Sequence, residues 1–571
     1  MADDPLLSRR RFLAASVAAA AAACSSSDDG AAPADPTATT APTTAPTATP
    51  DPTATPLPTP TPEPTATPTP EPVVVPEVPP SPIDGDPFGL GVASGDPDDT
   101  SVVLWTRFVT PDGTGIPDGD HPVLWEVATT ESFSTIVAAG LAPAVGALGH
   151  SVHVTAGGLR PDTSYAYRFR VGDQTSTVGR TRTFPAPDSS PSRARFAFSS
   201  CQHIQVGYYP AHRNLAESGL DFFVWLGDYI YERNARNSVI AADRRHTGDE
   251  AVDVAGYRNR YEQYKRDPDL QAHHAAHPWI VTWDDHEVDG NYANDLSQNN
   301  DPRDEFLARR ADAYQVWYEH MPVRLDPPEG PDIEIHRSFR WGDLMELFAL
   351  DTRQFRDPPP TDGDFISFGG LVDPALPIRT LSPDALDPER TVLGRAQETW
   401  LLDGLADTGA KWKVLAQSIV MQGFRLIPGA DPPLINVDGW DGYSGNRTAL
   451  FQAVADRDVE NVVILAGDLH LSIAGDVRID PFDDTSPIIA AEFVSSSISS
   501  TLGRITTAAE AIALPGNPQM RHFDTRRGYV ICEVDQDAAT GIFMTVDATN
   551  PNSQATEIAR FQTVDGVPGL I

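Results

Sequence analysis

Short apolar segments that end in Gly-Asp constrain the fold of this chain more than any other feature. Two of them are Phe222-Phe-Val-Trp-Leu-Gly-Asp228 and Val462-Val-Ile-Leu-Ala-Gly-Asp468. Each is a short, continuous run rich in β-branched or aromatic residues, which is typical of a buried strand. After Arg195 such runs alternate with longer helical stretches. The sequence therefore predicts a layered α/β domain over residues 192–571.

Before this domain, over residues 84–186, the sequence predicts a smaller unit of antiparallel strands. Apolar runs are separated there by turn residues, as in Ser101-Val-Val-Leu-Trp-Thr-Arg107, where the side chains of neighbouring residues alternate between two faces. With turns such as Gly95-Asp-Pro-Asp-Asp99, this alternation predicts a small antiparallel β-sandwich of fibronectin or immunoglobulin type. We expect a structural role for it, with carbohydrate or cell-wall binding as the alternative.

The first 82 residues predict export and a stalk. Residues 1–24 combine Arg9-Arg10 with an alanine-rich run that is too short and too weakly apolar for a stable membrane span, and they resemble a twin-arginine signal. Cys24 lies in a context that resembles a lipoprotein cleavage site, so we expect either a lipid anchor or cleavage without one. Residues 25–82 repeat Pro, Thr, Ala and Glu, which predicts a disordered, extended stalk. We therefore expect the twin-arginine export machinery as a partner and an extracellular or cell-surface location.

The charge of the chain excludes one class of partner. Its 42 Lys and Arg against 80 Asp and Glu give a formal net charge of −38 at pH 7. Binding to nucleic acid needs a basic surface, so no nucleic-acid partner is expected. A phosphate substrate would be repelled as well, unless the site supplies positive charge as metal ions or arginine.

Three strand-end motifs carry side chains that can bind a metal ion. Arg195-Phe-Ala-Phe-Ser-Ser-Cys201 presents a thiol, which taken alone is more often a small buried apolar group. Asp228 can bridge two metals with its two oxygens, and Tyr231, one helical turn later, can place a phenolate on the same ion. The alternative for this pair is a helix cap beside a packed tyrosine. Asp468 and His470 lie two residues apart after the last strand and form a chelating pair.

A fourth motif is the acidic loop Trp283-Asp-Asp-His-Glu-Val-Asp-Gly-Asn291. Like charges this close together are unfavourable without cations between them. His286 is placed to steady a phosphate or to protonate a leaving group. Asn291 offers a neutral oxygen ligand of the kind that calcium accepts.

In this order the four motifs resemble the calcineurin-like metallophosphoesterases, and their departures from that pattern match the PhoD-type alkaline phosphatases. Cys201 stands in place of an early Asp-x-His, Asp285 in place of Asn, and Asp468 in place of a histidine. The resemblance covers about residues 87–569 and implies a four-layer α/β/β/α sandwich for the catalytic domain. Further segments that carry it include Gly91-Val-Ala-Ser-Gly-Asp-Pro-Asp98, Tyr318-Glu-His-Met-Pro-Val-Arg324 and Leu350-Asp-Thr-Arg353.

The resemblance also implies a centre of Fe(III) and Ca²⁺. The residues that would hold the iron are Cys201, Asp228, Tyr231, Asp468 and His470. One or two calcium ions would share Asp228 and use Asp285 and Asn291. Arg353 would clamp the phosphate oxygens with its planar guanidinium, with a structural salt bridge as the alternative.

The sequence therefore predicts phosphoester hydrolysis, with Asp228, His286 and Arg353 in catalytic roles. Metal ions lower the pKa of bound water, so that hydroxide is available at neutral or alkaline pH. Members of the family attack both monoesters and diesters, so phospholipid or teichoic-acid diesters stay open as substrates beside monoesters. A non-catalytic surface protein is the second hypothesis, and the presence of every expected ligand argues against it.

Overall fold

The computed structural model describes residues 73–110, 115–364, 377–501 and 510–571. The predicted export signal, Cys24 and the stalk as far as residue 72 lie outside the described residues. Within the last part of the predicted stalk, the carbonyl oxygen of Pro79 accepts a hydrogen bond of 2.7 Å from the Gly172 N–H, so this part packs against the β-sandwich region. Among the described helices, none has the length and apolar content needed to cross a membrane.

Two β-sheets form the centre of the described unit. The first has nine strands in the order β23-β22-β21-β9-β10-β11-β1-β2-β5. Its strands are β1 (Val92–Gly95), β2 (Val102–Arg107), β5 (Ser151–Ala156), β9 (Arg193–Ser199), β10 (Phe222–Leu226), β11 (Pro278–Thr282), β21 (Arg527–Asp535), β22 (Ala538–Val546) and β23 (Thr556–Val564). Cys532 is buried within β21.

The second large sheet has seven strands in the order β12-β13-β15-β17-β19-β18-β20. Its strands are β12 (Arg337–Trp341), β13 (Met345–Ala349), β15 (Trp412–Ala416), β17 (Val462–Ala466), β18 (Ser472–Arg478), β19 (Ile488–Val494) and β20 (Met520–Asp524). A separate pair joins β14 (Ile378–Thr380) to β16 (Leu434–Asn436).

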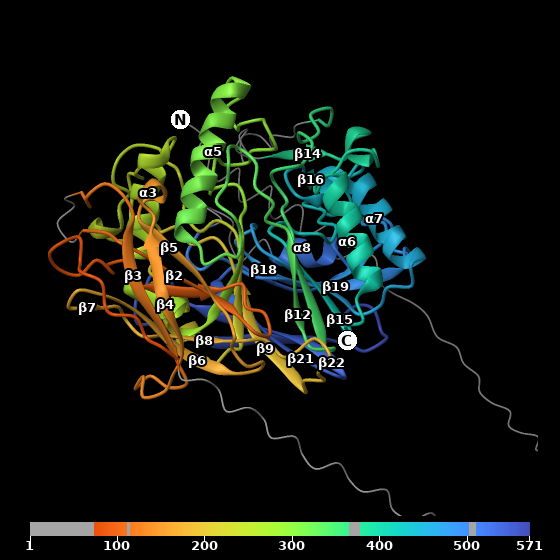
Figure 1. The fold of residues 1–571 in the computed structure, drawn as a ribbon. Coiled ribbons are helices and arrows are strands. Elements are labelled where there is room, and N and C mark those ends of the chain that lie inside the picture. The colour runs from red at the N-terminus through yellow and green to blue at the C-terminus, as the bar shows by residue number, and fades with distance from the viewer. Residues whose placement is uncertain (1–72, 111–114, 365–376, 502–509) are drawn as a thin grey trace, which may run out of the picture. The chain divides into compact units, whose positions relative to one another are not determined.

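Helices cover the outer faces of the two sheets, with α3 and α5 on one side of the strands and α6 and α7 on the other in Figure 1. The helices are α2 (Pro210–Ala216), α3 (Val254–Lys265), α4 (Pro268–Ala276), α5 (Arg303–His320), α6 (Arg395–Asp407), α7 (Ser444–Asp456) and α8 (Glu510–Gly516). The result is the predicted four-layer α/β/β/α arrangement.

The alternation of side chains along single strands explains these layers. In β10, Phe223 and Trp225 pack with residues of α3 and α5, whereas Phe222 and Val224 pack between the sheets. Likewise β17 turns Ile464 toward α6 and α7 and its neighbours toward the first sheet. Because both faces of each strand are buried, these segments are continuously apolar in the sequence.

The region over residues 84–186 contributes a second sheet of its own and also extends the first one. A five-stranded sheet packs through an apolar core onto β2 and β5. Its strands are β3 (His121–Ala128), β4 (Ile136–Ala144), β6 (Ser164–Val171), β7 (Gln174–Thr175) and β8 (Gly179–Arg182). However, β1 pairs in parallel with β11, so that one sheet runs from this region into the α/β domain. The sequence did not predict this continuity.

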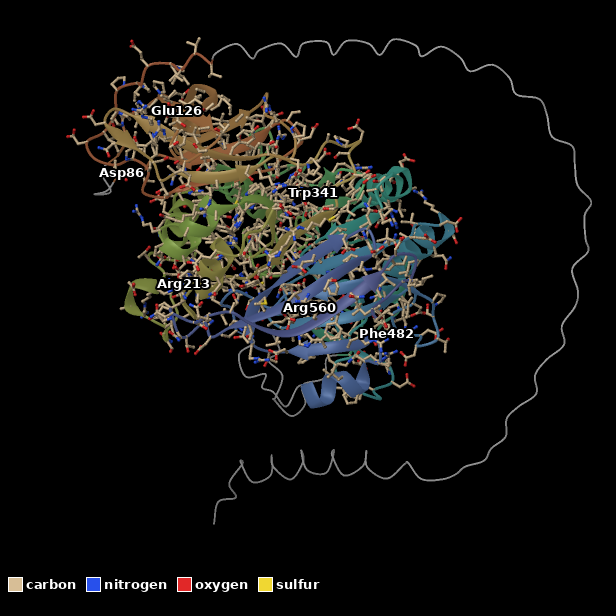
Figure 2. The ribbon with its side chains drawn as sticks, turned by 90° about the horizontal axis from the view of Figure 1, so that it is seen from below. Asp86, Glu126, Arg213, Trp341, Phe482 and Arg560 are labelled. Carbon is tan, nitrogen blue, oxygen red and sulfur yellow. The ribbon has the colours of Figure 1, made fainter. Side chains whose placement is uncertain are left out.

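The edges of the nine-stranded sheet therefore belong to opposite ends of the chain. β5 forms one edge and β23 the other. Figure 2 shows Arg560 on the blue C-terminal strands, well separated from the orange N-terminal region that carries Glu126. Between these edges β9, β10 and β11 run parallel, so their carboxyl ends meet on one side of the sheet.

Candidate metal centre

The backbone at the predicted ligands is unusual. A left-handed conformation, which costs a non-glycine residue about 1–2 kcal/mol, occurs at five of these positions. They are Cys201 (φ 58°), Asp228 (φ 58°), Asn291 (φ 56°), Asp468 (φ 60°) and His470 (φ 54°). Strained residues of this kind cluster at functional sites, because the surrounding structure must hold them in place.

The two glycines before Asp228 and Asp468 allow the strand ends to approach neighbouring loops. A Cβ atom at Gly227, which has a φ of 101°, would lie 2.4 Å from the Asp284 backbone nitrogen. A Cβ atom at Gly467 would lie 2.3 Å from Ser200 Oγ. Both distances are shorter than any normal contact, so only glycine fits at these two positions without displacing its neighbours.

One group of candidate ligands joins the ends of β9, β10 and β17. Cys201, Asp228 and His470 each offer a ligand atom, and these atoms all lie within 4.8 Å of one another. The Tyr231 hydroxyl donates a 2.7 Å hydrogen bond to Asp228 Oδ2 and lies 3.1 Å from His470 Nε2. A thiol, a carboxylate, a phenol and an imidazole therefore converge at one point, as the sequence predicted for four of the five iron ligands.

A second group lies beside the first and shares Asp228 with it. Ligand atoms of Asp228, Asp285 and His286 also lie within 4.8 Å of one another. The Asn291 N–H donates a 2.5 Å hydrogen bond to Asp285 Oδ2. Asp228 thus lies between the two groups, which is the position expected of a bridging carboxylate.

Asp468 lies beside these groups without belonging to either of them. Burial raises its pKa well above the ordinary value, and the nearby Asp284 carboxylate adds to this effect. The charge of Asp468 in turn helps to raise the pKa of the Cys201 thiol, after burial and Asp228. Asp468 is therefore close to the centre. However, it is not one of the converging residues, although the sequence predicted it as an iron ligand.

The electrostatics of the centre favour a bound cation. Burial raises the pKa of Cys201, Asp228 and Tyr231 well above their ordinary values. Neighbouring carboxylates add to all three shifts, because ionising one of these groups beside another is unfavourable. A positive ion reverses this balance by stabilising the deprotonated ligands.

The donor atoms fit two different kinds of ion. The group with Cys201, Tyr231 and His470 mixes sulfur, phenolic oxygen and nitrogen, which suits a transition metal. The second group offers the carboxylate oxygens of Asp228 and Asp285, which suit a hard cation such as Ca²⁺, and Asn291 contacts Asp285 through its backbone N–H. The residues present therefore fit the metal centre that the resemblance implies.

His286 is held by a carboxylate that sequence reasoning missed. Glu232 Oε2 lies 2.6 Å from His286 Nδ1, and Glu232 Oε1 accepts a 3.1 Å hydrogen bond from the Gly290 N–H. Burial opposes the protonated ring, but Asp285, Glu232 and Asp228 outweigh it and raise the pKa of His286. The sequence signal for Glu232 was its position directly after Tyr231 in the second motif.

A second missed residue, Glu287, joins the two ligand loops. It is fully buried and accepts hydrogen bonds from three backbone N–H groups. Their donors are Asp228 (3.1 Å), Tyr229 (2.5 Å) and Asp284 (3.0 Å). Glu287 therefore fixes the end of β10 against the loop after β11. In the sequence it was only one more acid in the fourth motif.

The segment after β19 contributes a third missed residue, Ser500. Its backbone N–H donates a 3.2 Å hydrogen bond to the Cys201 carbonyl oxygen, and its hydroxyl donates a 2.8 Å hydrogen bond to the Tyr231 hydroxyl. Ser497 forms an isolated bridge with Ser200 nearby. The serine-rich run Ser495-Ser-Ser-Ile-Ser-Ser500 was the signal in the sequence, and it joins the second sheet to the Cys201 loop.

Arg353 lies in the salt bridge that the sequence left open as the alternative to a phosphate clamp. Its side chain is fully buried, and its Nε donates a 2.5 Å hydrogen bond to Asp284 Oδ1. The rest of the guanidinium contacts Asp438, with nitrogen–oxygen distances of 3.0 and 2.9 Å. Arg353 therefore neutralises carboxylates behind the centre, and a phosphate could meet it directly only if these pairs opened.

Comparison with known proteins gives consistent matches over most of the chain. The family described as PhoD-like phosphatase matches residues 196–543, and the family described as PhoD-like phosphatase, N-terminal domain, matches residues 75–185. Alkaline phosphatase D of Bacillus subtilis (strain 168) is 43% identical over 455 residues, which cover 78% of this chain and 76% of the relative. A solved structure of PhoD is 38% identical, with a TM-score of 0.78 over 85% of this chain and 91% of that chain. These matches confirm the resemblance, and the protein belongs to the PhoD-like phosphatase family of phosphoester hydrolases.

Proposed function

We propose that this phosphatase hydrolyses phosphoesters at a centre of Fe(III) and Ca²⁺, with activity toward diesters as well as monoesters. The observation that carries the proposal is the convergence of Cys201, Asp228, Tyr231 and His470 from three separate strand ends. Thiolate and phenolate are both anionic ligands, and together on one ion they favour a highly charged metal such as Fe(III).

Under this proposal the two groups divide the ions between them. Iron would be held by the converging set, with Asp468 beside it as a further candidate ligand. Calcium shares Asp228 and uses Asp285 and Asn291. The shared position of Asp228 and the oxygen-rich loop around Asp285 support this division.

The residues of the chain then perform the remaining steps. Bound metal ions supply a hydroxide by lowering the pKa of coordinated water. His286 donates a proton to the leaving alkoxide, with Glu232 on Nδ1 fixing the ring so that Nε2 carries the transferred proton. Glu287 keeps Asp228 and the Asp284 loop at a constant spacing. Arg353 compensates the negative charge of Asp284 and, through it, of the acidic loop.

The test is Asp228→Asn, compared with Asp458→Asn. Both aspartates have a left-handed backbone, with φ values of 58° and 53°, but Asp458 is exposed and remote from the candidate ligands. We expect Asp228→Asn to lose phosphatase activity and iron together, as measured by elemental analysis and hydrolysis of 4-nitrophenyl phosphate, while Asp458→Asn keeps both. An Asp228→Asn protein that stays active and iron-loaded would overturn the proposal.

The identity of the metal has a separate optical test. An iron–tyrosinate bond absorbs visible light, so the purified enzyme should be coloured and Tyr231→Phe should be colourless. A colourless wild-type protein with full activity would exclude iron beside Tyr231. Hydrolysis of bis(4-nitrophenyl) phosphate, measured beside the monoester, tests the proposed activity toward diesters.

The proposed location rests on residues 1–24. The pair Arg9-Arg10 before an alanine-rich run supports export by the twin-arginine pathway, and Cys24 is the candidate for lipid attachment. Replacing both arginines by lysine should leave active enzyme inside the cell. Cys24→Ser should release it from the membrane fraction if a lipid anchors it, and export that is insensitive to the arginine pair would contradict the pathway.

A further inference from the structure

A polar cavity of about 660 Å³ lies next to the candidate metal centre. His203 and Glu232 form its inner wall. Its outer part is formed by residues 233–238 and by Gln298 and Asn299, whose side chains are mostly amides, hydroxyls or guanidinium groups. The cavity is thus suited to a polar ligand and belongs to none of the metal-binding groups described above.

Three observations place the inner end of this cavity near His286, either directly or through Tyr231, whose ring centroid lies 4.2 Å from that of His286. Glu232, in the cavity wall, lies 2.6 Å from His286 Nδ1. The ring of His203 stacks on Tyr231, with centroids 4.4 Å apart. A Cβ atom built on Gly290 would lie 3.1 Å from His286 Cε1 and 2.4 Å from a terminal guanidinium nitrogen of Arg233. The cavity therefore begins at the imidazole that protonates the leaving oxygen.

The carboxylates in the cavity wall are paired more closely than its two arginines. Glu232 is bonded to His286, and Arg309 pairs with Glu250 at 3.0 Å and with Asp289 at 3.4 Å. Arg233 is 51% exposed and makes only a 3.5 Å contact with Glu232 and a 3.4 Å hydrogen bond to Gln298.

The second arginine, Arg236, is exposed and forms no ion pair with any other described residue. Two cations with spare capacity therefore face the cavity. They supply local positive charge in a chain whose formal net charge is −38.

We propose that this cavity binds the leaving alcohol of the phosphoester, and that Arg233 and Arg236 select alcohols that carry a further anionic group. Guanidinium groups bind phosphate and carboxylate through charge-assisted hydrogen bonds. A second phosphodiester link in the same molecule would supply such a group, and so would a carboxylate. This inference rests on the proposed function, because it needs His286 to mark the leaving-group side.

The chemistry of hydrolysis assigns the two arginines to substrate binding. The bond between phosphorus and the leaving oxygen breaks, a bond from phosphorus to the water oxygen forms, and His286 gives a proton to the leaving oxygen. The distal anionic group takes no part in these changes. Loss of Arg233 and Arg236 should therefore raise KM for anionic substrates and leave kcat nearly unchanged.

Two matched probes test the proposal on the full-length enzyme. The first is a phenyl phosphate that carries a carboxymethyl group on the ring, and the second is its methyl ester, which keeps the size but removes the charge. In the double variant Arg233→Gln/Arg236→Gln we expect kcat/KM for the carboxylate probe to fall about tenfold, since each exposed ion pair contributes a few-fold. The neutral probe should change by less than about twofold, since it makes no such ion pair.

A control with the same change in net charge is Arg457→Gln/Arg560→Gln. Both side chains are partly exposed, at 38% and 49%, and neither lines the cavity. The proposal is overturned if the cavity variant lowers kcat/KM equally for both probes, or if the control reproduces its effect. If the wild type hydrolyses both probes and its preference between them does not depend on the arginines, the inference is rejected but the proposed function is not. If the wild type hydrolyses neither probe, the proposed function fails and the inference fails with it.

Discussion

The clearest structural prediction concerns Gly227→Ala at the carboxyl end of β10. Gly227 has a φ of 101°, and the added Cβ would lie 2.4 Å from the Asp284 backbone nitrogen and 2.5 Å from Asp284 Cβ. An ordinary contact at this point needs a separation of roughly 3.4 Å, so the two loops must separate by about 1 Å. Asp228 and Asp285 are the next residues on these loops, and both belong to the second group of candidate ligands.

The expected cost has two parts. The left-handed backbone costs alanine about 1–3 kcal/mol. Displacing the packed Asp284 backbone adds about 1–3 kcal/mol. The unfolding free energy should therefore fall by about 2–6 kcal/mol. A ligand that moves by about 1 Å can cost roughly 100-fold in rate, so we expect kcat to fall by about that factor and bound metal to decrease.

A matched control lies at the other end of the same strand. Gly219 also has a positive φ, 63°, but a Cβ atom there would meet nothing within 4 Å. Gly219→Ala should therefore lower the unfolding free energy by only about 1–2 kcal/mol and leave kcat unchanged. Urea unfolding, elemental analysis and kcat for 4-nitrophenyl phosphate measure the three effects. A Gly227→Ala enzyme with the metal content and kcat of Gly219→Ala would refute this account of the Gly-Asp motif.

Three further predictions concern buried carboxylates. In Glu287→Gln the side chain can accept only some of the hydrogen bonds that three backbone N–H groups now donate to Glu287, so kcat at saturating substrate should fall about tenfold. An unchanged kcat would show that these hydrogen bonds are not needed for activity. When a chelator removes the metal, the carboxylates of Asp228 and Asp285 repel each other. The melting temperature should therefore fall further in the wild type than in Asp228→Asn, and equal falls in the two proteins would contradict this. Burial raises the pKa of Glu492 from 4.5 to about 7. A raised pKa contributes stability that is fully present below pH 4.5 and lost as the pH rises through 7, so the wild type should lose about 3 kcal/mol relative to Glu492→Gln across this window. A constant difference between the two proteins would show that Glu492 titrates normally.

The ligand-bearing strand ends were predictable because they depend on local sequence. An apolar run followed by Gly-Asp predicts that a buried strand stops and that a carboxylate follows it. The β10 and β17 motifs both behave in this way. Parallel neighbours then place their carboxyl ends together, so the approach of Asp228 to Cys201 followed from the fold class.

The roles of Glu232, Glu287 and Arg353 were not predictable in the same way. A carboxylate in an acidic loop can bind metal, hold a histidine or accept backbone N–H groups, and the choice depends on which groups face it. Glu287 contacts the backbone of the loop after β10, at Tyr229, which is 58 positions away along the chain. Arg353 likewise donates a hydrogen bond to Asp438, which is 85 positions away along the chain.

By itself the sequence determined the strands, their buried faces and the chemical types gathered at their ends, because apolar periodicity and the Gly-Asp step act over a few residues. Only the tertiary structure decided that β1 pairs with β11 and that Arg233 lies beside His286. Backbone hydrogen bonds join any two strands whatever their side chains, so the partner of β1 is selected by the packing of the whole sheet. The arrangement of charges around the candidate metal centre depends on that packing, so it could not be predicted from the sequence alone.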